Sequence, residues 1–167
     1  GVRAALDIGT SPALIMDIGG GSIEFIIGTA QEIYWKKSYE LGAQRLFNKF
    51  YTTDPIEKTQ LDALVEYVTV ELKTLSQAIH IYKPVALIGS SGSFDTLCDM
   101  YIAEYGLEAN LEIETEFELP LEYFYHIYPI LAGKSTQDRM QIPGMSKIRV
   151  DMIVVAIGLI EAVLKMH

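Results

Sequence analysis

The most informative part of this sequence is Asp17-Ile18-Gly19-Gly20-Gly21-Ser22-Ile23-Glu24. It joins two apolar runs, residues 13–18 and 23–27, which the pattern predicts to be the short strands of a hairpin. Three successive glycines carry no Cβ, so their backbone amides are free to approach an oxyanion closely. The stretch therefore predicts a phosphate-binding loop formed by Gly19, Gly20, Gly21 and Ser22, in which Ser22 adds a hydroxyl donor.

Two carboxylates flank these glycines. Asp17 ends the first predicted strand and Glu24 lies just inside the second, so a tight hairpin brings both side chains to its mouth. Magnesium prefers oxygen ligands, and such a cation beside a phosphate loop is a natural combination. The alternative is a plain glycine hairpin with solvent-exposed acids. Because both acids lie within strongly apolar strands, the pattern favours a catalytic site in which Asp17 and Glu24 bind Mg2+.

A second loop, Gly89-Ser90-Ser91-Gly92-Ser93, lies between a predicted buried strand (85–88) and a predicted helix (94–105). Unpaired amides and the helix dipole favour an anion at such a helix start. The alternative is an ordinary helix entry capped by Ser91 or Ser93. Taken with the first loop, the pattern favours phosphate binding by both, because open α/β folds bind ligands at strand ends.

The remaining pattern predicts the α/β class. An alternating run at 32–39 is expected to add a third strand to the hairpin, and 41–51 changes to helical spacing. Asp54-Pro55 predicts the start of a helix that continues to about Tyr82. The later elements are expected to be a half-exposed strand at 111–119 and helices at 121–132, 135–140 and from 150 to the end. This order predicts a mixed sheet with helices packed on it.

The composition agrees with one folded domain and excludes several classes of protein. The chain has 167 residues, of which 50% are hydrophobic and 21% charged, so it is not a disordered chain. The net charge of -9 argues against nucleic acid as a partner, because binding to the phosphate backbone needs clustered Lys and Arg. No apolar run approaches the roughly 20 residues of a membrane helix, so no membrane partner is expected. The single cysteine, Cys98, forms no internal disulfide, which fits a cytoplasmic location.

These motifs, in this order, resemble those of the exopolyphosphatase/guanosine pentaphosphate phosphohydrolase (Ppx/GppA) family. Loops such as 17–24 occur across the wider superfamily of actin, heat-shock chaperones and sugar kinases, whose fold is ribonuclease H-like. Three further segments narrow the resemblance to the family over nearly the whole chain. They are Leu41-Gly42-Ala43-Gln44-Arg45-Leu46, the second loop at 89–93, and Ile142-Pro143-Gly144-Met145 followed by Arg149-Val150-Asp151 and Ile153.

The resemblance implies a hydrolase with two ribonuclease H-like domains and an active site in the cleft between them. Residues 1–167 correspond to the second domain, with both ends trimmed and without the first domain, which carries the family's catalytic glutamate. The parent protein is expected to remove terminal phosphates from polyphosphate or guanosine pentaphosphate with Mg2+, whereas the fragment alone is expected to be inactive. The preferred substrate, and whether the full-length protein is a homodimer, stay open.

The resemblance also assigns roles to residues. Asp17 and Glu24 are expected to bind the metal and its waters, while 19–22 and 89–93 are expected to bind phosphate oxygens. Arg45 either faces the substrate path or makes an ion pair on the helix surface.

Two further questions stay open at this stage. Arg149 and Asp151 are interpreted as an ion pair at a helix start rather than as site residues. Two other functions compete with the hydrolase: a non-hydrolytic phosphate- or nucleotide-binding regulatory module, and an actin-like ATPase.

Overall fold

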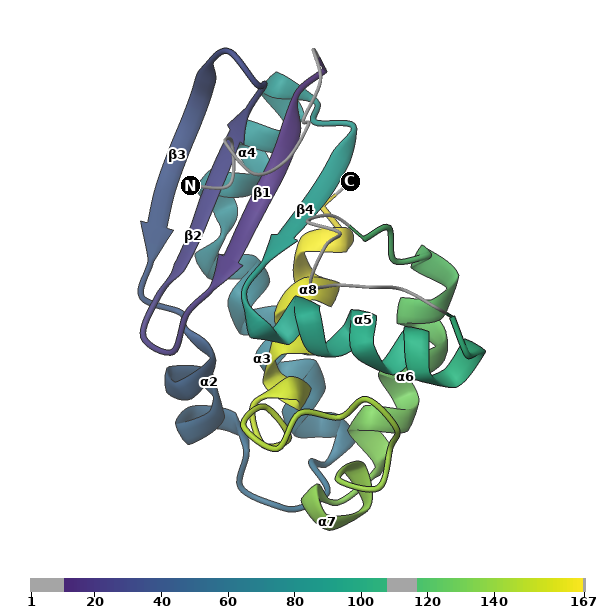
Figure 1. The fold of residues 1–167 in the computed structure, drawn as a ribbon. Helices are drawn as coiled ribbons and strands as arrows, with labels where there is room; N and C mark the ends of the chain where they lie inside the picture. The colour runs from purple at the N-terminus through teal and green to yellow at the C-terminus, as the bar shows by residue number, and fades with distance from the viewer. Residues whose placement is uncertain (1–10, 108–116, 167) are drawn as a thin grey trace.

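The computed structural model describes residues 11–107 and 117–166, which form a mixed sheet with helices packed on it (Figure 1). The four strands of this sheet lie in the order β3-β2-β1-β4. Strands β1 (Ala13–Ile18), β2 (Ile23–Gly28) and β3 (Ile33–Tyr39) form an antiparallel meander, and β4 (Ala86–Ser90) pairs with β1 in parallel. The predicted α/β class with a mixed sheet is confirmed.

The helices cover one face of the sheet and continue beyond it (Figure 1). They are α2 (Ala43–Phe50), α3 (Lys58–Glu71), α4 (Lys73–Tyr82), α5 (Gly92–Tyr105), α6 (Leu121–Gly133), α7 (Thr136–Arg139) and α8 (Ile153–Leu164). Helix α4 packs on β2 and β3, whereas α3 packs against α8, which is buried along most of its length. None of the helices in the described ranges has the length and hydrophobicity to cross a membrane.

The apolar runs form strands because each supplies side chains to the core. Leu14, Met16 and Ile18 of β1 are all 2% exposed or less and belong to the hydrophobic core. Successive side chains of a strand point to opposite faces of the sheet. Asp17, which lies between Met16 and Ile18, is therefore directed to the face opposite the core, where it is half-buried.

The predicted helix start at Asp54-Pro55 is wrong. Helix α3 begins at Lys58 because Glu57 and Gln60 form a capping box, in which the Glu57 N–H donates to Gln60 Oε1 at 3.2 Å. Asp54 instead accepts the N–H of Thr136, at 2.9 and 3.0 Å to its two carboxylate oxygens. The acid that was expected to cap α3 thus binds the start of α7.

The predicted single helix to Tyr82 is divided at Leu72. Leu72 ends α3 and precedes α4, with a ψ of 17° that departs from helical geometry, and its side chain is fully buried. The division has a packing reason, since α3 lies against α8 and α4 lies against the sheet. One straight helix would not pack against both α8 and the sheet.

Three other predictions need correction or fall outside the structure. The strand predicted as buried, now β4, is an edge strand within the described sheet, with Ala86 exposed and the other residues half-buried. Helix α5 begins at Gly92, so Gly89 and Ser90 belong to β4. Of the strand predicted at 111–119, residues 111–116 lie outside the described residues and 117–119 are not strand. The helices predicted in the C-terminal third are confirmed with shifted ends.

Arg139 is a completely buried charge that joins distant parts of the chain. Its guanidinium lies 3.9 Å from Asp54 Oδ1, so the charge is partly balanced. Its hydrogen-bond acceptors are the carbonyls of Leu131, Lys134 and Val150 and the hydroxyls of Tyr51 and Thr136. Arg139 therefore connects the end of α2, the turn between α6 and α7, and the segment before α8.

Replacing Arg139 is expected to destabilise the fold strongly. In Arg139→Met the carbonyls of Leu131, Lys134 and Val150 lose their donor, and Asp54, which is partly exposed, loses its cation. A buried acceptor left without a partner costs about 1–3 kcal/mol, so a loss of at least this size in unfolding free energy is expected. Urea denaturation measures the loss. Lys58→Met is the control, because Lys58 makes only an exposed ion pair with Asp62 and its removal should cost less than about 1 kcal/mol. Equal losses in the two variants would contradict this account of Arg139.

Candidate phosphate-binding site

The glycine loop between β1 and β2 forms the foundation on which α2 begins. Within the loop, the Gly19 N–H donates to the Ser22 carbonyl at 2.9 Å. No side chain caps α2. Instead, the N–H groups of Gly42, Ala43 and Gln44 donate to the carbonyls of Gly21, Gly19 and Gly20, at 3.2, 2.9 and 3.0 Å. The loop carbonyls thus satisfy the amides that a helix start leaves unpaired.

This docking directs the remaining loop amides away from α2. In a trans peptide the C=O and the N–H point in opposite directions, so the peptides whose carbonyls face α2 present their amides on the other side. These amides belong to Gly20, Gly21 and Ser22, and within the described ranges none of them donates to the protein backbone. Three donors on one loop that have no hydrogen-bond acceptor among the described residues form the kind of concavity that binds an anion.

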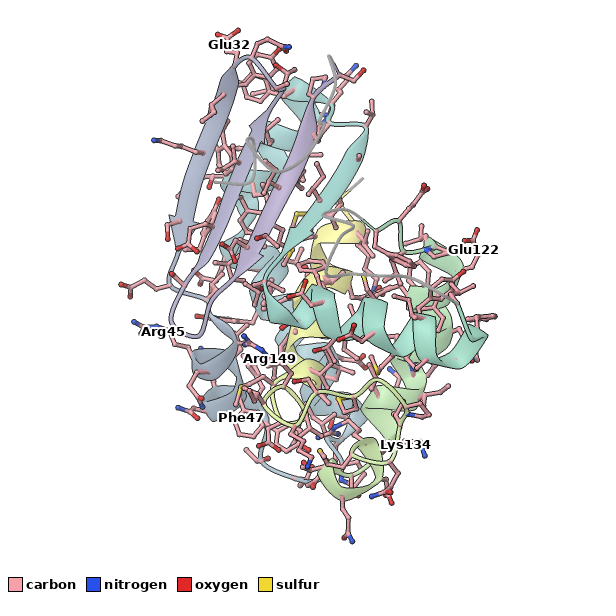
Figure 2. All side chains as sticks on the ribbon, in the orientation of Figure 1. Glu32, Arg45, Phe47, Glu122, Lys134 and Arg149 are labelled. Carbon is pink, nitrogen blue, oxygen red and sulfur yellow. The ribbon has the colours of Figure 1, made fainter. Side chains whose placement is uncertain are left out.

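Arg45 supports the loop from the first turns of α2 (Figure 2). Its Nε donates to the Gly21 carbonyl at 2.8 Å, and its guanidinium lies 3.7 Å from Glu40. The expected ion pair on the helix surface is therefore present. A phosphate contact by Arg45 stays a prediction.

Asp17 and Glu24 are directly opposite each other on β1 and β2. Burial, followed by the charge of Glu24, raises the pKa of Asp17 above its ordinary value. Two carboxylates whose repulsion raises a pKa form a donor set suited to a hard cation, which would relieve that repulsion. Within the described residues no group of three or more potential metal ligands is found, so a bound cation would take its other ligands from water or substrate.

Ser38 also belongs to the site, although the sequence did not indicate it. Its Oγ donates to Glu24 Oε1 at 2.8 Å, and the Ser22 Oγ donates to the same oxygen at 2.6 Å. The strand registers align Ser38, Glu24, Asp17 and Ser90 in one row across β3, β2, β1 and β4. Only the register of β3 against β2 reveals Ser38, because nothing near it in the sequence marks a site.

The second predicted loop meets the first at the ends of β1 and β4. Ser90 is the parallel partner of Asp17, and the Ser91 Oγ donates to the Ile18 carbonyl at 3.1 Å. Ser91 has a φ of 92°, a backbone conformation that is strained for a residue with a side chain. The structure therefore brings together both predicted loops, as the sequence required. Their binding of phosphate stays a prediction.

Arg149 lies at the start of α5, beside the second predicted loop, although the sequence did not indicate a functional role for it (Figure 2). A Cβ on Gly92 would come within 2.7 Å of the Arg149 Nε, so only glycine leaves room for this approach. The predicted ion pair between Arg149 and Asp151 is wrong, since no ion pair of Arg149 is found among the described residues. A cation beside the positive end of a helix dipole is unfavourable unless an anion binds between them.

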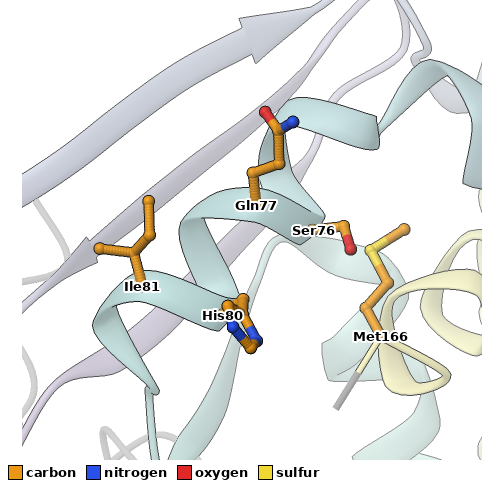
Figure 3. Close-up of a pocket in the computed structure, with 5 residues that line it drawn as sticks. All are labelled: Ser76, Gln77, His80, Ile81 and Met166. Carbon is orange, nitrogen blue, oxygen red and sulfur yellow. The ribbon is translucent and has the colours of Figure 1, made fainter.

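A separate hollow lies between α4 and the end of α8 (Figure 3). It is open, and it is lined by Ser76, Gln77, His80, Ile81 and Met166. No carboxylate, lysine or arginine lines it, and α4 lies behind the half of the sheet away from the glycine loop (Figure 1). The charged groups suited to phosphate chemistry are therefore at the loops and not in this hollow.

The fold and the site together define the class of protein. A mixed sheet with packed helices, and a glycine hairpin beside a second loop at the strand ends, is the arrangement of the actin-like ATPase type of fold. Within that class, the chain belongs to the Ppx/GppA phosphatase family, since the model of this family matches residues 1–166.

Known proteins similar to this chain agree with the family. A crystal structure of an exopolyphosphatase from Cytophaga hutchinsonii is 42% identical, with a TM-score of 0.94 over 99% of this chain and 53% of that one. A PPX-GPPA enzyme of Aquifex aeolicus is 20% identical, with a TM-score of 0.81 over 99% of this chain and 53% of that one, and shows the fold alone. The uncharacterized protein SCO0757 of Streptomyces coelicolor is 28% identical, over 82% of this chain and 40% of that protein. The chain thus spans about half the length of these solved relatives.

Gly42 is expected to be essential for the loop. In Gly42→Ala the new Cβ would lie 2.4 Å from backbone atoms of Gly20 and Gly21, so α2 would move off the loop carbonyls. We expect a loss of about 1–3 kcal/mol in unfolding free energy, together with weaker binding of inorganic phosphate. Urea denaturation and equilibrium dialysis measure the two effects.

Gly133→Ala is the control for this prediction. A Cβ at Gly133 meets no atom within 4 Å, so the substitution should leave both measurements nearly unchanged. A Gly42→Ala variant with wild-type stability and phosphate binding would refute the role given to the docking of α2.

Asp17→Asn is expected to stabilise the fold, although it replaces a residue predicted to bind a metal ion. The raised pKa of Asp17 means that its charged form is disfavoured in the folded state, by burial and by Glu24. At neutral pH the variant should therefore have a higher unfolding free energy than the wild type. The gain should shrink as the pH falls through the raised pKa and vanish below the ordinary value of 3.8, where Asp17 is protonated in both states. Chemical denaturation as a function of pH tests this, and an unchanged or lower stability at neutral pH would contradict it.

Proposed function

We propose that this chain is the phosphate-binding lobe of a hydrolase that removes terminal phosphates from inorganic polyphosphate or guanosine pentaphosphate. One observation carries the proposal: the unpaired amides of the 19–22 loop adjoin the facing carboxylates of Asp17 and Glu24. Membership of the Ppx/GppA family and the likeness to an exopolyphosphatase support it.

Mg2+ is the proposed cofactor, with Asp17 and Glu24 as its protein ligands. The donor set fits a hard cation, since both side chains are carboxylates and face each other across two strands. When bound, Mg2+ would offset the negative charge of the phosphate oxygens and of the group that leaves.

The residues of this chain bind and orient the terminal phosphate. The amides of Gly20, Gly21 and Ser22 are fixed by the docking of α2, so they are preorganised donors for phosphate oxygens. Arg149, together with the start of α5, offers positive charge on the other side of the strand ends. Such fixed donors stabilise the charge that develops as the terminal phosphate is transferred to water.

The group that activates the attacking water is proposed to lie in the remaining half of the full-length protein. The two carboxylates at the loop, Asp17 and Glu24, are both assigned to the metal. The resemblance to the family places a catalytic glutamate in the first domain. The lobe alone is therefore expected to hydrolyse little.

Phosphate release from inorganic tripolyphosphate by the full-length protein tests the function. Glu24→Ala should lower kcat/KM by about 100-fold or more, because it removes a metal ligand and the partner of Ser22. Glu32→Ala is the control, since Glu32 is exposed at the other end of the sheet (Figure 2). Release by Glu24→Ala at the wild-type rate would refute the assigned site, and no release by the wild type would leave the non-hydrolytic module as the function.

An actin-like ATPase is the remaining alternative, and calorimetry separates it from the hydrolase. We expect the full-length protein to bind a polyphosphate chain in the presence of Mg2+ more tightly than ATP, because the chain belongs to the Ppx/GppA family and is similar to an exopolyphosphatase. Tight binding of ATP without binding of polyphosphate would overturn the proposed function.

A further inference from the structure

We propose that Ser38 is a positioning residue that holds Glu24 in place while the phosphate group occupies the glycine loop. This inference rests on the proposed function, because it concerns the same site, and it assigns a role to a residue on a third strand. Ser38 lies on β3 and takes no part in either loop.

The geometry shows what Ser38 does to Glu24. The Ser38 Oγ donates to Glu24 Oε1 at 2.8 Å, across the register pair that joins β3 to β2. A carboxylate has two oxygens, and this bond engages only Oε1. Glu24 Oε2 is thus left for the cation that Glu24 and Asp17 are proposed to share.

Ser38 is needed because Ser22, the other donor to Glu24, is expected to turn to the phosphate. In the free protein the Ser22 Oγ also donates to Glu24 Oε1, at 2.6 Å, so two hydroxyls hold one oxygen. A hydroxyl has a single proton, and a phosphate in the loop would take the donor of Ser22. Ser38 is then the remaining side-chain donor to Glu24 among the described residues.

The register of the strands explains why Ser38 is able to hold Glu24 in place. Ser38, Glu24 and Asp17 occupy one row across adjacent antiparallel strands, so their side chains emerge on the same face. The neighbouring Tyr39 is buried in the core and fixes β3, with its hydroxyl 2.6 Å from Thr74 Oγ1 on α4. The position of the Ser38 hydroxyl is therefore set by the sheet and not by the glycine loop that holds the phosphate.

The consequence is a coupling between the two ligands that depends on Ser38. Without phosphate, Ser38→Ala leaves Ser22 to orient Glu24, and the affinity for a divalent cation should change little. With phosphate bound, the same variant leaves Glu24 without either hydroxyl, and the affinity should fall by about tenfold, as is typical when a partner of a metal ligand is removed.

Electron paramagnetic resonance of Mn2+ binding to the full-length protein tests this. Mn2+ stands in for Mg2+, and methylenediphosphonate, which cannot be hydrolysed, stands in for the substrate. We expect Ser38→Ala to bind Mn2+ about tenfold more weakly than the wild type with the diphosphonate and within about twofold without it. Ser38→Thr keeps the hydroxyl and suits a strand, so it should restore the wild-type affinity.

Two controls complete the experiment. Ser76→Ala removes a hydroxyl from α4, where no hydrogen bond of this side chain to a described residue is found, and should bind Mn2+ like the wild type. Ser22→Ala should lose affinity for the diphosphonate itself, which separates the two serines.

Three results would overturn the inference. One is wild-type Mn2+ affinity of Ser38→Ala with the diphosphonate, and another is an equal loss with and without it. The third is failure of Ser38→Thr to restore the affinity while it keeps the wild-type thermal stability. If instead the wild type itself binds neither Mn2+ nor the diphosphonate, the proposed function fails, and this inference fails with it.

Discussion

The docking of α2 on the glycine loop is the interaction on which the rest of the site depends. A helix start has unpaired amides and a glycine hairpin has unpaired carbonyls, and here each satisfies the other. Because the carbonyls are engaged by α2, the loop amides are left pointing the other way, available to an anion. Gly42 permits this close approach, since any Cβ there would collide with the backbone of Gly20 and Gly21. The segment that follows β3 thus matters because its amides engage the carbonyls of the glycine loop.

An acidic chain is able to attract an anion by this means because the local electric field differs from the net charge. The formal charge is -9, yet backbone amides and helix dipoles contribute fixed positive ends that the sum of side chains does not count. Arg149 at the start of α5 adds a cation where the field is already positive. A cation bound by Asp17 and Glu24 would add further positive charge beside the loops. The net charge of the whole chain therefore does not argue against the binding of one phosphate at the loops.

Much of the fold and of the candidate site could be predicted from the sequence. The features that were missed or wrong share a physical cause, since each depends on contacts that a local sequence pattern does not show. Asp17 and Glu24 were predictable because a hairpin of known length sets their register. Ser38 was not, since its place depends on the pairing of β3 with β2, which contains an irregularity at Ile27 and Gly28. The place of Arg149 in the site was not predictable either, because it depends on a contact with Gly92, which is far away in the sequence. The error at Asp54 arose from competition between two possible caps, which a local pattern does not resolve.

Three unfavourable features lie together at the ends of β1 and β4. Asp17 has a raised pKa, Ser91 has a positive φ, and Arg149 lies beside a helix start without an ion pair to any described residue. Each costs stability in the free protein, and such features persist where a ligand or a mechanism needs them. A divalent cation and a phosphate would relieve two of the three, since the cation neutralises the carboxylates and the anion separates Arg149 from the α5 dipole. The well-packed core, with α8 buried along most of its length, offsets these costs. The separation of a stable core from a destabilised edge is the physical argument that this edge binds ligands.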